Sequence, residues 1–484
     1  MDSGIAAPVR EPNRAAGDCS GVGPEPLKRS EILIVLGLFL AAFVVYSLAW
    51  PGAPVMTLDG PSYMRLAQDI RNFSLRELPL RTPGLPLLLI LTGSAEHVNR
   101  WFFDLSLLLH FTGIALLAYL LRVFRVPGKL VLPVIVLGLL PPFVEPAAYV
   151  ASEAASQCTL LMVFVSVVLW LMKPRRTLFA VVSVGLPLTA MVRPTYELLV
   201  VLLIGCLGAG YAFGLFPQVS RGRMALLMAV SAVLTFGTQV AWSTVNYARF
   251  GYFGTTRMLP IALSIKTEDV LEFLPPEYAD LRRILIPYRD QNLTEPFRDH
   301  TGKDYIYRAM PAVLKHYGGD LTAATIHLKA AFLYLAKHKP MSFLSNGLKT
   351  LGLVWMPNDC ELCGSNFAVR GLTALLQIGV EAVFLLQALA LVGAGLIYAP
   401  ARPITRGQGR TFGGRIERTR VWAYGFGVAI VIYTLGLSCL MGTGEPRYRQ
   451  TVDLLMIGLC ALGYAIWRDI LARECNTAGD GIQE

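Results

Sequence analysis

Long apolar runs, separated by short polar segments, dominate the chain from residue 31 onward. Many of these runs reach the roughly 20 residues that a helix needs to cross a bilayer. We count ten predicted spans, near residues 31–50, 101–123, 130–149, 154–172, 177–193, 195–215, 224–243, 372–398, 422–441 and 451–468. The first run is too long for the apolar region of a cleaved signal peptide, so we expect it to be retained. The pattern predicts an all-α polytopic membrane protein with about ten transmembrane helices.

Two long segments between the predicted spans have a different pattern. Loop 51–100 contains "LAQDIRNF" and "GLPLLLILTG", and loop 244–371 contains "EYADLRRILIPYRDQ" and "TIHLKAAFLYLAKHKPMSFLSNGLKTLGLVW". Their apolar positions follow helical spacing, which predicts amphipathic helices on the outer membrane face. The resulting division is a disordered N-terminus (1–30), an N-terminal transmembrane module (31–243, with outer loop 51–100), a long outer loop region (244–371), C-terminal transmembrane helices (372–468) and a cytoplasmic tail (469–484).

Composition strengthens the membrane assignment, and charge adds an orientation. Of 484 residues, 54% are hydrophobic and 16% charged, whereas soluble domains have about 25% charged residues. The net charge of +10 is concentrated in short loops such as "KPRR", "SRGR" and "RGQGRTFGGRIERTR", which are typical of the cytoplasmic side rather than of nucleic-acid binding. We therefore expect both termini and the Arg402–Arg420 loop to be cytoplasmic, with Asp59, Lys303 and Glu445 outside.

Cysteine and histidine give no reason to expect a metal or another cofactor. Cys360 and Cys363 form one C-x-x-C pair, which is half a zinc site, and a disulfide between them stays open. His110 lies inside a predicted span, where we expect it to make hydrogen bonds between helices. Asp104, Glu197, Glu381 and Asp453 lie near span ends. We expect most of them to form structural ion pairs.

The stretch "TLDGPSYMRLAQDI" (residues 57–70) places Asp59 soon after the first span. One interpretation is structural, because "D-G-P-S" is typical of a turn and a helix N-cap. The other is catalytic, because a carboxylate beside a membrane cavity can take a proton from an attacking hydroxyl.

Five segments, in order along the chain, resemble the GT-C superfamily of membrane glycosyltransferases. They are Asp59 with Tyr63, Ala67 and "RTPGLPLLL"; "PPFVEPAAYVASEAAS"; "LTAMVRPTYELLVVL"; "NYARFGYF"; and "GEPRYRQTVDLLMIGL". The resemblance is to the bacterial branch related to protein O-mannosyltransferases and lipid A aminoarabinose transferases. The tyrosine usual in that branch's "PGYP" segment is Leu85 here.

The resemblance implies transfer of a sugar from a polyprenyl-phosphate donor to an acceptor hydroxyl at the non-cytoplasmic face of a bacterial inner membrane. The acceptor can be a glycan, a lipid or a protein, and the reaction inverts the anomeric centre. Asp59 would be the general base, within the 31–243 module. In the family, the outer loop between the third and fourth spans often supplies a second acidic group. Glu153 is the first candidate for it and Glu145 the second.

The lipid phosphate that leaves in this reaction needs fixed positive charge, and arginine suits phosphate. The candidates for donor binding are Arg81, Arg193, Arg257, Arg447 and Arg449, with Tyr63 beside them. Arg193 lies between two spans, where a charge is costly and often functional. For Arg193, an alternative is snorkelling to the interface, and for the "RYR" segment it is interface anchoring.

Two other classes of function stay open. A transporter or flippase of a lipid-linked saccharide would commonly show two repeated halves with broken helices, and neither is clear in the chain. A non-catalytic scaffold would not require acidic and basic residues gathered on one face. The identities of the sugar and of the acceptor stay open as well.

Overall fold

The computed structural model describes residues 29–50, 54–57, 59–294, 304–357, 367–398, 412–441 and 446–480. Within these ranges the regular secondary structure is helical, apart from one isolated bridge between Val55 and Tyr149. The all-α class predicted from the sequence is confirmed. The two cysteines Cys360 and Cys363, together with Lys303 and Glu445, lie outside the described residues.

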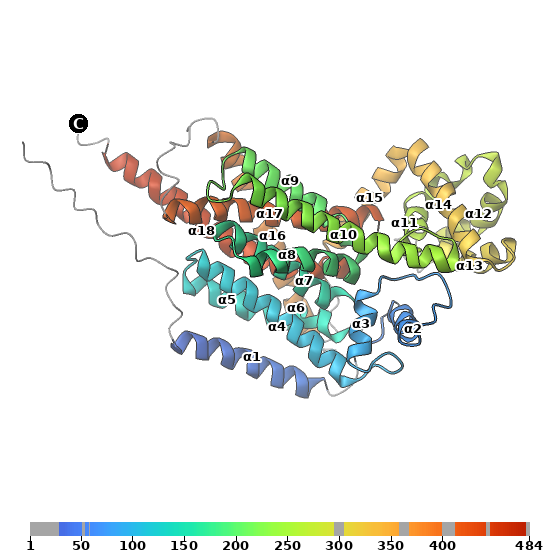
Figure 1. Cartoon of the computed structure of the whole chain (residues 1–484), viewed down its shortest axis with the longest axis horizontal. Helices are drawn as coiled ribbons and strands as arrows, with labels where there is room; N and C mark the ends of the chain where they lie inside the picture. Colours follow the sequence, from blue (N-terminus) through green and yellow to red (C-terminus); the bar gives the residue numbers. More distant parts are fainter. Residues whose placement is uncertain are drawn as a thin grey trace, which may run out of the picture.

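A bundle of long apolar helices forms the body of the molecule (Figure 1). In the described part of the chain, eight helical segments are long and apolar enough to cross a membrane. They lie in α1 (Arg29–Ala49), α4 (Arg100–Val123), α7 (Glu153–Met172), η3 with α9 (Pro194–Tyr196 and Leu199–Ala212), α10 (Arg221–Phe250), α16 (Phe367–Tyr398), α17 (Phe412–Met441) and α18 (Gln450–Asp480). The chain is a multi-pass membrane protein.

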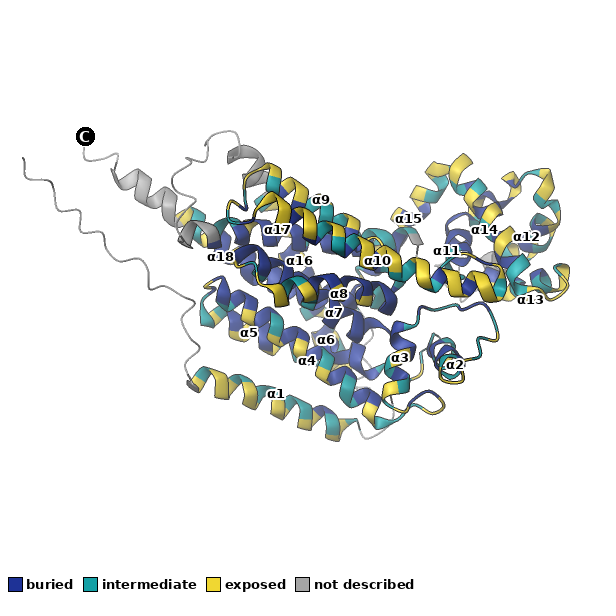
Figure 2. Ribbon diagram, viewed as in Figure 1, coloured by how far each residue is buried: buried dark blue, intermediate teal, exposed yellow. Residues whose placement is uncertain are grey.

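The bundle is built around α7, which packs against α4, α8, α17 and α18. Figure 2 shows α7 almost entirely buried, whereas α1 at the margin exposes most of its surface. The exposed residues of α1 include Leu33, Leu40 and Leu48, which are side chains that lipid can cover. Burial therefore separates the helices that organise the bundle from those at its lipid-facing edge.

Two of the ten predicted spans have a different form. The span expected at 130–149 is α5 (Gly128–Gly138) followed, after a bend of 66°, by α6 (Pro141–Val144) and η2 (Glu145–Ala148). Consecutive prolines at 141 and 142 explain the break, because proline interrupts helical hydrogen bonding and disfavours helix in the residue before it. The span expected at 177–193 is α8 (Arg176–Val192), which has only 17 residues.

The segments between spans fold into helices at one end of the bundle (Figure 1). The shorter segment supplies α2 (Gly60–Arg71) and α3 (Gly84–Leu91). The longer one supplies α11 (Met258–Lys266), η4 (Glu268–Phe273), η5 (Pro276–Tyr278), α12 (Ala279–Thr294), α13 (Asp304–His316), α14 (Leu321–His338) and α15 (Pro340–Val354). These outer helices, α11 to α15, enclose an apolar core of their own, which includes Leu271, Tyr305 and Phe332. The helices predicted in both loops are confirmed.

Candidate active site

A cavity of about 550 Å³ lies where the bundle meets the outer helices. Its lining comes from the segment before α2, the start of α7, the connection between α8 and α9, and parts of α10, α11, α14 and α17. The charged side chains in its wall are those of Asp59, Arg81, Glu153, Arg193, Glu197 and Lys329. The volume is within the range of small-molecule sites.

Asp59 reaches this cavity through hydrogen bonds between two distant segments. The backbone N–H of Val55 donates to the carbonyl oxygen of Ala148 (2.7 Å), and that of Val150 donates to Val55 (3.0 Å). The hydroxyl of Thr57 donates to the carbonyl oxygen of Val150 (2.9 Å). These bonds hold the chain before α2 against the loop that leads into α7.

The Asp59 carboxylate is bound by two arginines from opposite ends of the sequence. Arg81 Nη2 donates to its Oδ1, and Arg447 Nη2 donates to its Oδ2 at 2.7 Å. Asp59 occupies the N-cap position of α2, but its side chain makes no capping hydrogen bond. The capping interpretation is therefore wrong for the side chain.

These arginines also determine the protonation of Asp59. Burial alone would raise the pKa of the carboxyl group, but the positive charges of Arg81 and Arg447 outweigh burial and hold the pKa below its usual value. Asp59 is therefore an anion at neutral pH. An ionised carboxylate is the form that a general base requires.

Arg81 is placed by a tight approach between α3 and α8. A Cβ atom at position 84 would lie 2.6 Å from the carbonyl oxygen of Met191, so only glycine lets α3 begin against the end of α8. Arg81 Nε donates to Ser62 Oγ at 3.0 Å, and its guanidinium lies 5.1 Å from the ring centroid of Tyr63. The "RTPG" segment thus aims Arg81 at the start of α2.

Glu153 and Arg193 form the second ion pair of the cavity, with 3.0 Å between Arg193 Nη1 and Glu153 Oε1. Both side chains are buried, and Arg193 also donates to Ser152 Oγ at 3.3 Å. The ring of Tyr448 lies between this pair and the first, with the guanidinium carbons of Arg193 and Arg447 at 5.1 and 5.4 Å from its centroid. Tyr448 joins the two ion pairs into one charged cluster.

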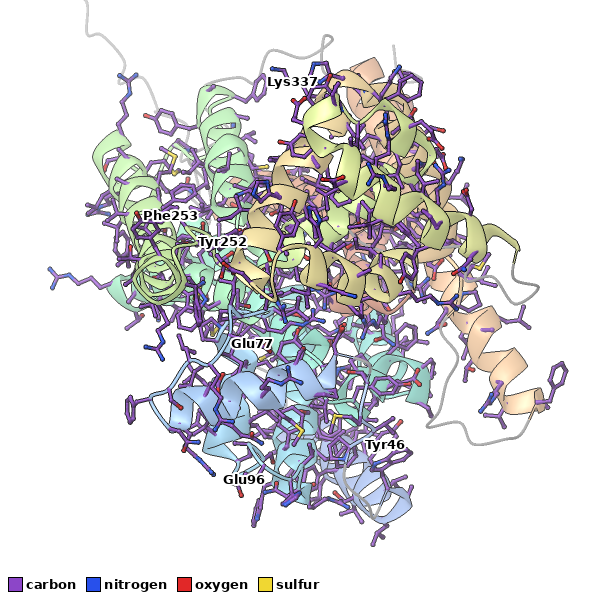
Figure 3. The ribbon with its side chains drawn as sticks, turned by 90° about the vertical axis from the view of Figure 1, so that its right-hand side faces the viewer. Tyr46, Glu77, Glu96, Tyr252, Phe253 and Lys337 are labelled. Atoms are coloured by element: carbon purple, nitrogen blue, oxygen red, sulfur yellow. The ribbon has the colours of Figure 1, made fainter. Side chains whose placement is uncertain are left out.

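Two sequence-predicted arginines are placed elsewhere. Arg257 does not line the main cavity but a smaller one of about 240 Å³, where its Nη2 lies 3.7 Å from Glu77. Figure 3 shows Glu77 between the helices of the 51–100 segment and the outer helices. Arg449 follows the short turn η9 (Pro446–Tyr448). It is fully buried and pairs with Glu381 on α16 at 2.5 Å and with Asp453 on α18 at 3.1 Å.

Several other expectations have clear outcomes. The two nitrogens of His110 lie 2.9 Å from Gln157 Oε1 and from the carbonyl oxygen of Gly138, which confirms its interhelical bonding. Asp104 forms the expected ion pair with Arg100, at 3.0 Å, as Glu381 and Asp453 do with Arg449. Glu145 is buried, does not line the cavity, and accepts a hydrogen bond from Tyr149.

Two further charged residues of the cavity, Glu197 and Lys329, were not predicted from the sequence as site residues. Glu197 was expected to form an ion pair, but its carboxylate instead accepts a hydrogen bond from Thr255 Oγ1 at 2.5 Å. Its position four residues after Arg193, in "RPTYE", is the one signal that links it to the site. Lys329 comes from α14, and its Nζ lies 5.5 Å from the ring centroid of Tyr252. Nothing distinguishes it in the sequence from the other lysines of the outer helices.

Comparison with known proteins gave distant structural likeness and no match in sequence. No protein-family model matches the chain, and no curated protein sequence matches it. Among solved structures, the chain is similar to the crystal structure of ArnT from Cupriavidus metallidurans bound to undecaprenyl phosphate. The match covers 90% of this chain and 77% of that one, with 11% sequence identity and a TM-score of 0.36.

Proposed function

We propose that the protein is an integral membrane glycosyltransferase that moves a sugar from a polyprenyl-phosphate donor to an acceptor hydroxyl of a glycan, lipid or protein, with inversion. The observation that carries this proposal is Asp59, held by Arg81 and Arg447 at a cavity between the apolar bundle and the outer helices. This setting suits the donor, because its tail belongs in lipid and its head needs a charged site.

The charges of the cluster favour a donor with a single phosphate. Among the described side chains of the cluster, Arg81, Arg193 and Arg447 face two carboxylates, Asp59 and Glu153. The cluster thus carries one excess positive charge. A sugar linked to a lipid through one phosphate is a phosphodiester with one negative charge, which balances that excess. Fixed arginines would also stabilise the charge that develops on the leaving phosphate.

Donor binding also explains how a paired carboxylate can act as a base. While Arg81 and Arg447 hold Asp59, they lower its affinity for a proton. A donor phosphate competes for the same guanidinium groups, and each hydrogen bond that moves to the phosphate leaves a carboxylate oxygen of Asp59 more basic. The acceptor hydroxyl would then lose its proton to Asp59 as its oxygen attacks the anomeric carbon, and the bond from that carbon to the phosphate oxygen breaks.

We further propose that the cavity faces the non-cytoplasmic side of the membrane. Arg418 and Arg420, near the start of α17, lie at the end of the bundle away from the outer helices (Figure 1), where Arg420 donates to the carbonyl oxygen of Phe124 and pairs with Asp469. A cysteine placed at the exposed Glu277 should react with an impermeant thiol reagent in intact cells, and one at the exposed Arg221 should not. Labelling at position 221 but not at position 277 would contradict this orientation and place the cavity on the cytoplasmic side.

The decisive experiment for the function is a transfer assay with purified protein in liposomes. The substrates are polyprenyl-phosphate mannose, glucose and arabinose, each radiolabelled in the sugar, with an envelope lipid extract as acceptor. We expect label to move from at least one donor to the acceptor or to water. Movement of intact donor between leaflets without transfer would instead establish the flippase alternative.

A further inference from the structure

One carboxylate in the cavity has no part in the proposed mechanism. Glu197 follows the η3 turn and lines the cavity four residues after Arg193. In the part of the chain that the structure describes, its carboxylate has one hydrogen-bond donor, Thr255, and no cation at ion-pair distance. A carboxylate that lines a cavity without a counter-ion can accept further hydrogen bonds from a ligand.

Glu197 and Thr255 are both held in place by one face of α10. Gln239 Nε2 donates to the carbonyl oxygen of Glu197 at 2.9 Å. Trp242 Nε1 donates to the carbonyl oxygen of Thr255 at 3.0 Å, and Asn246 Nδ2 donates to the same oxygen at 3.3 Å. Positions 239, 242 and 246 have the spacing of a single helical face. The backbone at Glu197 and at Thr255 is therefore fixed before any ligand arrives, and the two side chains are joined by their own hydrogen bond.

Aromatic side chains surround this end of the cavity. Tyr252, Phe253 and Tyr433 all line it, and Figure 3 shows Tyr252 and Phe253 close together beside α10. The hydroxyl of Tyr433 donates to the carbonyl oxygen of Thr195 at 2.6 Å, which fixes its ring. Aromatic faces combined with a few acceptor oxygens suit a sugar, whose C–H faces are apolar and whose hydroxyl groups donate hydrogen bonds.

We propose that Glu197 and Thr255 bind two neighbouring hydroxyl groups of the transferred sugar and thereby determine which sugar the enzyme uses. The inference rests on the proposed function. One hydroxyl donates to the Glu197 oxygen that Thr255 leaves open. The other donates to Thr255 Oγ1, whose own proton is already directed at Glu197. Arg193, at the other end of the same turn, remains beside the phosphate.

Hydroxyl groups provide the donors that Glu197 and Thr255 lack, because Thr255 already directs its own proton at Glu197 and leaves acceptor positions open. Lys329, whose Nζ lies 5.5 Å from the ring centroid of Tyr252, lines the same cavity.

The test compares Glu197→Ala and Glu197→Gln with the wild type and with Glu277→Gln, a matched change at an exposed carboxylate of the outer helices. Two quantities are measured: kcat/KM for the donor that the wild type uses, and the affinity for a short-chain polyprenyl phosphate without a sugar. We expect Glu197→Ala to lower kcat/KM at least 100-fold and to change the affinity for the sugar-free lipid less than twofold. Glu277→Gln should change neither.

The Glu197→Gln variant identifies the sugar chemistry, because glutamine retains an acceptor oxygen but not the charge. For a hydroxyl-bearing sugar we expect Glu197→Gln to lower kcat/KM about tenfold. A donor that lacks one of the two hydroxyls should lower kcat/KM further for the wild type but not for the variant. A loss as large as that of Glu197→Ala, together with preference for an amino-sugar donor, would overturn the hydroxyl assignment. Equal weakening of sugar-free lipid and donor would assign Glu197 a structural role.

The outcomes also separate this inference from the proposed function. If the wild type transfers sugar and Glu197→Ala does so equally well, the inference is wrong and the function stands. If the wild type neither transfers from any tested donor nor binds the sugar-free polyprenyl phosphate, the proposed function fails and the inference fails with it.

Discussion

Arg447 and Arg449 are two residues apart, yet they belong to two clusters with opposite properties. Arg447 binds Asp59 beside an open cavity, with about a fifth of each side chain exposed. Arg449 binds Glu381 and Asp453 where no part of its side chain is exposed. The residue types are the same in both clusters. What differs is access, because Asp59 lines the cavity and the Arg447 side chain is partly exposed, so a ligand can compete for that ion pair.

The buried cluster also differs in what it connects. Arg449 donates to the carbonyl oxygens of Val354 and Met356 at the end of α15, while its carboxylate partners lie on α16 and α18. It thereby ties an outer helix to the membrane bundle. The open cluster can be expected to govern chemistry and the buried one to govern folding, and variants of each separate these roles.

The largest effect is expected for Asp59→Asn, which keeps the side chain's size but removes the base. Transfer should fall roughly 10²–10⁴-fold, the range of general bases. Asp104→Asn is the matched control, because it also removes a carboxylate paired with an arginine, but away from the cavity. Turnover and melting are measured on the same preparations. Near-native turnover of Asp59→Asn would exclude it as the base and make Glu153 the leading candidate.

Arg449→Ala should give the largest loss of stability. Removing one partner of a buried ion pair costs roughly 3–5 kcal/mol, because the remaining carboxylates stay buried without a cation. We expect a low yield of folded protein and a large fall in the melting temperature in detergent. If the variant melts like the wild type but has lost donor binding, Arg449 belongs to the donor site, and the two clusters do not differ in role as proposed.

Arg447→Ala should have the intermediate effect, and on transfer rather than on folding. The loss of one charge-assisted hydrogen bond to phosphate costs roughly 1.5–3 kcal/mol, which is about a 10- to 100-fold decrease in kcat/KM. Melting should change far less than for Arg449→Ala. If Arg447→Ala retains full turnover, the segment that contains it serves only as an interface anchor.

The sequence predicted the framework well because hydrophobic spacing reports directly on membrane spans and amphipathic helices. It did not predict the bend within 130–149, where paired prolines interrupt the apolar segment. It could nominate Asp59, Arg81 and Arg447 by residue type, but not their contact, which depends on a hydrogen-bonded pairing between Val55 and the loop before α7.

Arg449 and Glu197 show why residue type alone does not assign a role. Arg449 shares the "RYR" segment with Arg447, but the chain turns between them and sends the second arginine into the bundle. Glu197 lies near a span end, as Asp453 does, and the same pattern predicts an ion pair for both. Only the three-dimensional arrangement places Thr255 beside Glu197 and Arg449 beside Asp453.

The smallest effect expected is the pH dependence of the open cluster. Because the pKa of Asp59 is lower in the folded protein than in the unfolded chain, its ion pairs stabilise the fold fully above the unfolded value of about 3.9. That contribution is lost as the pH falls through the folded value. It should amount to about 1 kcal/mol or less, since the pairs are partly exposed to solvent.

The measurement is the difference in melting temperature between the wild type and Asp59→Asn, which should stay constant from pH 7 to about pH 5 and shrink below about pH 4. Return of the samples to pH 7 should restore the difference. A difference that already shrinks between pH 7 and pH 5 would mean that burial outweighs the two arginines and raises the pKa of Asp59, and the open cluster would then not hold an ionised base.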